Sequence, residues 1–314
     1  MNSASNPPPA HDLELLQCDY PDWFGRCFDV TRAEGVVNVE GADIHYFRWG
    51  SPEKPGVVMA HGFMAHARCW AFIAPLLAEN YCLVALDLSG MGDSGWRASY
   101  DVQVRARECM EVARHAGLAD KPTLVCHSYG GGVGITSTAR YPDFWGGLIV
   151  CDMSMLAPGE PFQFEERISN REQRGVRPHR VHEDFASIRR RFRLAPDQPC
   201  ANDFLMEYMA RHSVKRVDGG YVWKFDPNIM GPDNERDEDW WQAVAPNFVQ
   251  LNMPRGVIYG EHSQMMSANA LGYLRAESGG EIPLVRIVDA HHHVMMDQPI
   301  AVAAAIDSLL QALR

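Results

Sequence analysis

A short apolar run that ends abruptly in a serine constrains the fold of this chain more than any other feature. The run Thr123–Val125 predicts a buried strand, and small and apolar residues recur at helical spacing over Tyr129–Arg140. Ser128 is therefore expected in a turn from strand to helix, which strains its backbone and leaves little room two residues away on either side. Gly130 meets this requirement, and Cys126 meets it less comfortably. A serine that only caps the helix is the alternative interpretation.

Strands and helices alternate along most of the chain. Apolar segments that are continuous or alternating predict strands, and segments with helical spacing predict helices. The predicted strands are 36–39, 44–47, 57–59, 82–87, 123–125, 147–152, 256–260 and 284–288. The predicted helices among them are 70–78, 102–116, 129–140 and 300–313. This order indicates an α/β fold with a mostly parallel central sheet and helices on both faces.

The alternation stops in the middle of the chain. Residues 153–252 are charged and mostly helical in period, with helices expected at 185–192 and 204–211 and a turn at 218–220. We interpret this segment as a helical cap inserted into one sheet domain. The predicted divisions are a tail and arm (1–34), a first core part (35–152), the cap (153–252) and a second core part (253–314). The first 12 residues, rich in Pro and Ser, are expected to be disordered.

Composition excludes several classes of partner. The formal net charge is -11 at pH 7, whereas a nucleic-acid-binding surface is basic. The eight cysteines have no metal-ligand spacing, and some lie in predicted strands, which is typical of a reducing compartment. No apolar run reaches membrane-spanning length, and the N-terminus lacks the features of a signal peptide. We therefore expect a cytoplasmic protein that binds neither nucleic acid nor membrane. The sequence leaves monomer and homodimer open.

Four landmarks, in one order, make the chain resemble the α/β-hydrolase superfamily from residue 35 onwards. They are His61-Gly62-Phe63, the turn Asp87–Ser94, the elbow at Ser128, and His291–Pro299 near the end. The resemblance implies an α/β-hydrolase fold with a helical cap, in the serine-nucleophile branch that includes esterases. It also implies that Asp87–Ser94 is a structural turn. No Lys-Ser/Thr follows its glycines, so a nucleotide-binding loop is not expected.

The resemblance implies His292 as the catalytic base. Serine is a poor nucleophile without a positioned base, and in the family this base lies seven residues before a proline, here Pro299. His291 and His293 flank it. Adjacent histidines project in different directions, which argues against a metal site in this triplet. No metal and no organic cofactor is implied.

A carboxylate must orient the imidazole of the base and stabilise its positive charge. Many family members place this acid three residues after the glycine that corresponds to Gly260, where this chain has Ser263. The resemblance implies Asp152 instead, because a subset of the family takes its acid from the end of the strand after the elbow helix. Ser263 would then donate an accessory hydrogen bond. The remaining candidate acids are Glu261, Asp289 and Asp297.

The resemblance also implies an oxyanion hole made of backbone N–H groups. These belong to Tyr129, directly after the nucleophile, and Phe63 in the early loop. His61 is expected to form structural hydrogen bonds beneath that loop. Candidate residues of a soft apolar pocket are Met153, Met266 and His293, although such methionines are more often core filler.

These features predict a serine hydrolase that cleaves a carboxylic ester, or a related acyl bond, through an acyl-enzyme. The serine nucleophile argues against dehalogenase and epoxide-hydrolase chemistry, which need a carboxylate in this fold. Three alternatives stay open: a hydrolase of carbon–carbon bonds in ring-cleavage products, a lyase or cofactor-free peroxidase, and a ligand-binding protein. The expected substrate is a small molecule with an apolar part. The arginines of Arg189–Arg193 are candidates for attracting a carboxylate, but a solvated helix face is the preferred interpretation.

Overall fold

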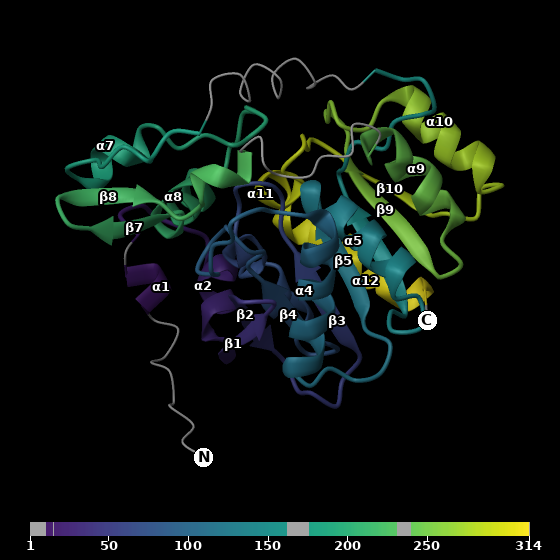
Figure 1. The fold of residues 1–314 in the computed structure, drawn as a ribbon, viewed down its shortest axis with the longest axis horizontal. Helices are drawn as coiled ribbons and strands as arrows, with labels where there is room; N and C mark the ends of the chain where they lie inside the picture. Colours follow the sequence, from purple (N-terminus) through teal and green to yellow (C-terminus); the bar gives the residue numbers. More distant parts are fainter. Residues whose placement is uncertain (1–10, 15, 162–175, 231–239, 314) are drawn as a thin grey trace.

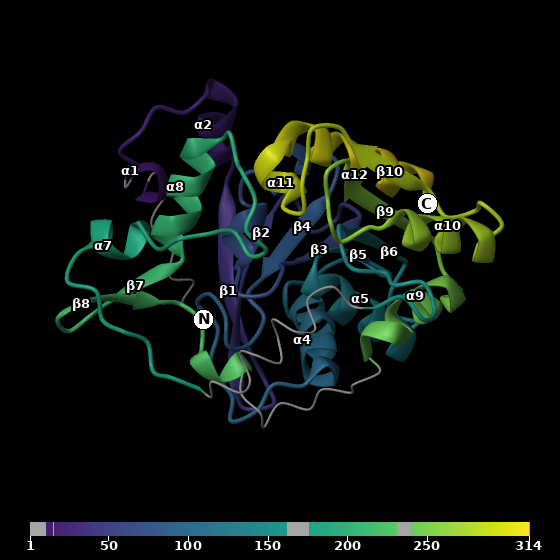
Figure 2. The ribbon, with the colours of Figure 1, turned by 90° about the horizontal axis from the view of Figure 1, so that it is seen from above.

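An eight-stranded sheet forms the centre of the computed structural model, which describes residues 11–14, 16–161, 176–230 and 240–313. Its order is β1-β2-β4-β3-β5-β6-β9-β10, as Figure 1 and Figure 2 show. The strands are β1 (Arg32–Val39), β2 (Ala42–Trp49), β3 (Gly56–Ala60), β4 (Cys82–Leu86), β5 (Thr123–His127), β6 (Gly147–Cys151), β9 (Arg255–Gly260) and β10 (Leu284–Ile287). β2 pairs antiparallel with β1 and β4, and all other neighbours are parallel. The predicted mostly parallel sheet is confirmed.

Helices cover both faces of this sheet. One face carries α2 (Asp22–Asp29), η1 (Ala67–Trp70), α3 (Ala74–Leu77), α11 (Val294–Asp297) and α12 (Pro299–Ala312). The other carries α4 (Val102–His115), α5 (Tyr129–Arg140), α9 (Trp240–Gln250) and α10 (Ala268–Glu277). The helix predicted at 70–78 is instead split into η1 and α3, and Pro75, which lacks an N–H donor, lies in the first turn of α3. Within the described ranges, no helix has both the length and the apolarity to cross a bilayer.

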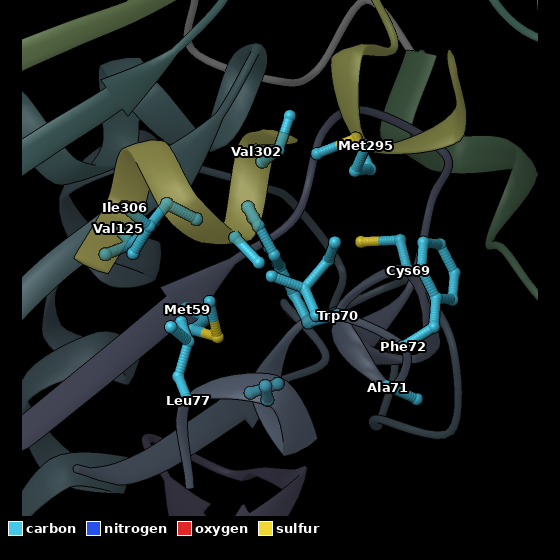
Figure 3. Close-up of a cluster of buried hydrophobic side chains, with 14 of the residues drawn as sticks. Met59, Cys69, Trp70, Ala71, Phe72, Leu77, Val125, Met295, Val302 and Ile306 are labelled. Carbon is cyan, nitrogen blue, oxygen red and sulfur yellow. The ribbon is translucent and has the colours of Figure 1, made fainter. Parts of the chain in front are cut away.

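Each face of the sheet has its own apolar cluster, because successive side chains of a strand point to opposite faces. Along β5, Val125 joins the cluster beneath α12, whereas Leu124 and Cys126 join the cluster beneath α4 and α5. Figure 3 shows part of the first cluster, to which Trp70, Val125 and Ile306 all belong. The candidate site lies at the carboxyl ends of the strands, where Ser128 follows β5 and Asp152 follows β6.

A smaller lobe is inserted after β6. Its described elements are α7 (Phe185–Arg189), α8 (Asp203–His212), the antiparallel hairpin β7 (Val214–Val217) and β8 (Gly220–Trp223), and η2 (Pro227–Met230). The two helices predicted here are present, and the turn predicted at 218–220 closes the hairpin. The expected cap, 153–252, also contains α9, which Figure 1 shows with the core helices instead. Gly132 of α5 leaves the space that the Trp240 ring of α9 fills, so α9 packs on the core.

The N-terminal arm joins this lobe to the core. Phe24 of α2 is fully buried, and its ring contacts Phe204 and Tyr208 of α8 at centroid distances of 5.1 and 5.6 Å. It also lies 6.1 Å from Phe72 of the core. Edge-to-face ring pairs of this kind stabilise beyond their buried area. β1 begins at Arg32, so the expected arm, 1–34, overlaps the sheet. Residues 1–10 of the tail lie outside the described residues.

Candidate active site

Ser128 lies in a strained turn between β5 and α5. Its φ of 52° and ψ of -125° fall where non-glycine residues are rare. A methyl group at Gly130 would lie 2.5 Å from the carbonyl oxygen of His61 and 2.9 Å from that of Ala60, so only glycine fits there. The Ser128 side chain makes no capping hydrogen bond to α5. The helix-cap interpretation of this serine therefore lacks its defining contact.

Cys126 is accommodated at a position where the turn leaves little room for a side chain. A methyl group at Gly134, in the next turn of α5, would lie 2.7 Å from the Cys126 sulfur. The missing side chain at Gly134 thus makes the room that the thiol needs. Burial raises the pKa of this thiol well above its ordinary value, so the thiolate is disfavoured and the residue acts as a small apolar group.

Three side chains that are distant in sequence meet at the carboxyl edge of the sheet. The Nε2 atom of His292 lies 2.9 Å from Ser128 Oγ, and its Nδ1 atom lies 2.9 Å from Asp152 Oδ1. Asp152 directly follows β6, and His292 lies in the loop between β10 and α11. Asp152 is fully buried and His292 is 3% exposed. The structure therefore brings together the serine, base and preferred acid of the sequence analysis.

The Asp152 carboxylate is held by three donors. Its Oδ2 atom accepts the backbone N–H of Gly260 at 2.7 Å, and its Oδ1 atom accepts the hydroxyl of Ser263 at 2.5 Å. His292 Nδ1 is the third donor. Ser263 thus occupies the usual acid position of the family and donates to Asp152, the accessory contact that the sequence analysis expected. Hydrogen bonds to a buried carboxylate are stronger than those between neutral groups.

This arrangement selects one tautomer of His292. An ionised carboxylate only accepts hydrogen bonds, so Nδ1 must carry the proton that faces Asp152. The lone pair on Nε2 then faces the Ser128 hydroxyl and is free to accept its proton.

The competing acids lie elsewhere. Glu261 pairs with Arg286 at 3.3 Å and accepts the backbone N–H of Asp289 at 3.2 Å. The Asp289 side chain is mostly exposed and lies 3.9 Å from His262. Asp297 accepts the backbone N–H of His291 at 2.7 Å. Of the four candidate acids, Asp152 alone is within hydrogen-bonding distance of His292.

His61 supports the loop that is expected to supply one oxyanion donor. Its Nε2 atom accepts the backbone N–H of Leu88 at 3.0 Å, and its Nδ1–H donates to the carbonyl of Gly62 at 2.7 Å. Burial lowers the pKa of His61, which keeps the ring neutral, as this donor and acceptor pair requires. A methyl group at Gly62 would lie only 3.1 Å from Ser128 Cβ, so the loop runs directly beside the serine.

The backbone N–H groups of Phe63 and Tyr129 are the oxyanion donors that the family resemblance implies. Phe63 follows Gly62, and Tyr129 begins α5, where the first N–H groups of a helix have no partner within it. Within the described residues, neither N–H donates to a protein acceptor. The positive end of α5 adds to the attraction for a developing negative charge.

Aromatic rings and two of the predicted pocket residues share one apolar cluster on the α5 side of the sheet. The half-buried rings of Phe63 and Tyr129 meet edge to face at 5.5 Å, and Trp240 lies 6.1 Å from Tyr129. Met153 and Met266, which were candidate pocket residues, belong to the apolar core beneath α5. His293, the third candidate, packs its ring against His127 and His292.

The arginines of Arg189–Arg193 and Trp223 lie in the lobe. Arg189 and Arg211 both pair with Glu207 at 2.7 Å, which neutralises part of the run. The other arginines, Arg190, Arg191 and Arg193, are exposed. Trp223 contacts Phe192 within the lobe at a centroid distance of 6.5 Å. These positions agree with a solvated face and with aromatic packing inside the lobe.

His127, immediately before the nucleophile, contacts the loop of the base. Its Nε2 atom donates to the backbone carbonyl of His292 at 3.0 Å. Burial, together with the nearby His292 ring, lowers the pKa of His127 to about 3, so the side chain is neutral. The sequence analysis assigned His127 no role. Its place as a polar residue at the end of an otherwise apolar strand was the signal that could have identified it.

A buried ionic group lies under the turn Asp87–Ser94. His45 donates to Asp87 at 2.8 Å and contacts Glu34 at 2.7 Å. Burial lowers the pKa of His45, but its hydrogen bonds and charge interactions with Asp87 and Glu34 outweigh this and raise the pKa to about 9. Asp87 also accepts the backbone N–H groups of Ala67 and Asp93. The turn is therefore structural, as expected, and it ties the early loop to the sheet.

Among the residues that the structure describes, two groups of His and acidic side chains have the spacing of metal ligands. They are His45, Asp87 and Asp93, and Glu261, His262 and Asp289, each with ligand atoms within 4.8 Å of one another. The first group is already joined by internal hydrogen bonds, and Glu261 of the second pairs with Arg286. Neither group includes the triplet of His291–His293.

Comparison with known proteins identifies the family. The model of the alpha/beta hydrolase family matches residues 57–305. A serine hydrolase-like protein of Mus musculus is 25% identical over 303 residues, which cover 85% of this chain and 91% of that protein. Lipase LipV of Mycobacterium tuberculosis is 30% identical over 118 residues, which cover 37% of this chain and 44% of the lipase. The solved structure of E-2-(acetamidomethylene)succinate hydrolase has the same fold, with a TM-score of 0.73 at 20% identity over 90% of this chain and 100% of that one. The chain therefore belongs to the alpha/beta hydrolase family.

Proposed function

We propose that this protein is a serine hydrolase that cleaves a carboxylic ester, or a related acyl bond, of a small molecule with an apolar part. One observation carries the proposal: Ser128, His292 and Asp152 form a continuous chain of hydrogen bonds, each 2.9 Å long. The strained backbone of Ser128 and its lack of a capping bond support a chemical role over a structural one. A serine hydrolase-like protein and a lipase among the relatives agree with it.

The proposed reaction begins with attack of Ser128 Oγ on the acyl carbon. The Oγ–C bond forms as the hydroxyl proton moves to His292 Nε2, and Asp152 stabilises the resulting imidazolium. The N–H groups of Phe63 and Tyr129 hold the oxyanion. When the bond to the leaving alkoxide breaks, His292 returns the proton to it, leaving the acyl-enzyme.

Water completes the cycle. His292 removes a proton from water as its oxygen bonds to the acyl carbon, and the bond to Ser128 then breaks with return of that proton to Oγ. Phe63 and Tyr129 directly follow Gly62 and Ser128 in the chain, and their half-buried rings meet edge to face, which supports a substrate with an apolar part. The proposed reaction uses no cofactor.

Labelling with a fluorophosphonate tests the proposal. Activated Ser128 forms an Oγ–P bond as fluoride leaves, so intact mass and peptide mapping of the wild type should find one adduct on Ser128. Ser128→Ala and His292→Ala should abolish both the adduct and hydrolysis of p-nitrophenyl esters. Ser154→Ala, a matched control at a buried serine whose hydroxyl donates to the Met265 sulfur at 3.5 Å, should keep both. A folded wild type that takes up no probe, or Ser128→Ala with wild-type turnover, would reject the proposed function.

A further inference from the structure

The loop that carries the base is held by side chains from three separate parts of the chain. The backbone N–H of His291 donates to Asp297 Oδ2 at 2.7 Å. The carbonyl of His292 accepts from His127 Nε2 at 3.0 Å. The backbone N–H of His293 donates to Gln198 Oε1 at 2.8 Å. The backbone of His292 and of both its neighbours is therefore held by hydrogen bonds, although no strand or helix includes His292.

Gln198 is the member of this set that comes from the inserted lobe. It lies between α7 and α8, and its side-chain amide spans the base loop. While Oε1 accepts the N–H beside His292, Nε2 donates to Asp297 Oδ2 at 3.0 Å. The same Asp297 oxygen accepts the N–H of His291. One amide thus connects the contacts on both sides of the base.

Asn202, four residues after Gln198, binds the other end of the base loop. Asn202 Nδ2 donates to the carbonyls of Met296 and Asp297 at 2.7 and 3.0 Å. These carbonyls are at the end of α11, away from His292. Asn202 therefore joins the lobe to the loop without contacting the backbone of the base.

The lobe is also anchored to the core independently of Gln198. The backbone N–H of Asp226 donates to the carbonyl of Gly90 at 2.8 Å, and the Asp226 carboxylate accepts the hydroxyl of Tyr100 at 2.6 Å. Phe24 of the arm packs on α8 as described above. Loss of the Gln198 amide should therefore change the base loop without detaching the lobe.

We propose that Gln198 is a positioning residue for the base, so that the inserted lobe completes the active site. This inference rests on the proposed function, because it assigns Gln198 an effect on the reaction through His292. Without the amide, the N–H of His293 and the carboxylate of Asp297 each lose a partner, and the segment 291–293 can shift. A displacement of about 1 Å at a catalytic group can cost about a hundredfold in rate.

The test compares Gln198→Met with Asn202→Ala. Methionine keeps the length of glutamine but has neither its carbonyl nor its NH₂ group. For Gln198→Met we expect kcat and the rate of phosphonylation to fall by about ten- to a hundredfold, with little change in KM. Asn202→Ala should keep both rates near those of the wild type. Thermal melting should show similar stability for the two variants.

A readout that does not need turnover separates this inference from the proposed function. The Nδ1 proton of His292, which is held against Asp152 at 2.9 Å, should give its own low-field proton resonance. That resonance should be lost or broadened in Gln198→Met and kept in Asn202→Ala. An unchanged resonance in Gln198→Met, or equal losses of kcat in both variants, would overturn the inference. If instead the wild type fails to label at Ser128, the proposed function fails while the resonance still decides the role of Gln198.

Discussion

Replacing Asp152 by asparagine should disable the base without disturbing the fold. The backbone N–H of Gly260 can only donate, so the amide oxygen of the new side chain must take the place of Oδ2. Its NH₂ group then takes the place of Oδ1, facing His292 Nδ1 and the Ser263 hydroxyl. One N–H donates to each of them. His292 must therefore carry its proton on Nε2. This atom faces Ser128 and, once protonated, can no longer accept the hydroxyl proton.

The size of the effect follows from two contributions. An imidazolium loses the attraction of a carboxylate at hydrogen-bonding distance, which is worth about 4 kcal/mol at an effective dielectric constant of about 20. The wrong tautomer gains a hydrogen bond worth about 1 kcal/mol net. Together they raise the barrier by about 5 kcal/mol, which lowers kcat by about 10⁴. The substitution is isosteric, so circular dichroism and thermal melting should show an intact fold.

Steady-state hydrolysis of p-nitrophenyl acetate measures this prediction. Glu261→Gln is the matched control, because Glu261 was the alternative acid and pairs with Arg286 instead of His292. It should leave kcat near that of the wild type. The reasoning is refuted if Asp152→Asn keeps kcat within about tenfold of the wild type, or if Glu261→Gln causes the larger loss.

Three further predictions concern residues that support the site. Ser263→Ala removes the 2.5 Å hydrogen bond to the Asp152 carboxylate, so the free energy of unfolding in urea should fall by about 2 kcal/mol, with a smaller loss of kcat than in Asp152→Asn. Gly130→Ala places a methyl group 2.5 Å from a backbone oxygen and should lower the melting temperature sharply, whereas Gly272→Ala, a helical position with open space, should raise it. The raised pKa of His45 stabilises the folded chain below about 6.5, and this stability is lost as pH rises through about 9. A pH series of urea unfolding should show that fall in the wild type but not in His45→Gln.

Local patterns in the sequence were enough to predict the core elements and the elbow. Most strands of the sheet are short apolar runs, whereas β1 and β2 mix apolar with polar residues. Gly130, two residues after Ser128, lies where the helix comes closest to the end of β3. The family resemblance, through the distance to Pro299, selected His292 among three histidines, and the structure brings that histidine to both Ser128 and Asp152. The catalytic roles of these residues stay predictions until the variants are measured.

The rest depends on contacts between distant segments, which leave no local pattern. Gln198 lies between two prolines in an irregular stretch of the lobe, and nothing in its neighbourhood indicates that it meets residue 293. The place of α9 depends on the space that Gly132 leaves for Trp240, a fit between surfaces rather than a periodicity. The break in the helix predicted at 70–78 could have been found, because Pro75 lacks the N–H that a helix interior needs.

The ring cluster around Phe24 bears on how caps can be exchanged between relatives. A chimera that replaced only the inserted lobe would lose Phe204 and Tyr208. The Phe24 ring, which is fully buried in this protein, would then pack against a surface that does not fit it. Exchange of the lobe alone should therefore give poorly folding hybrids. Transfer of α2 together with the lobe should preserve the ring contacts between α2 and α8. For recombination and engineering, the arm and the lobe form one transferable unit, although most of the sheet separates them in the gene.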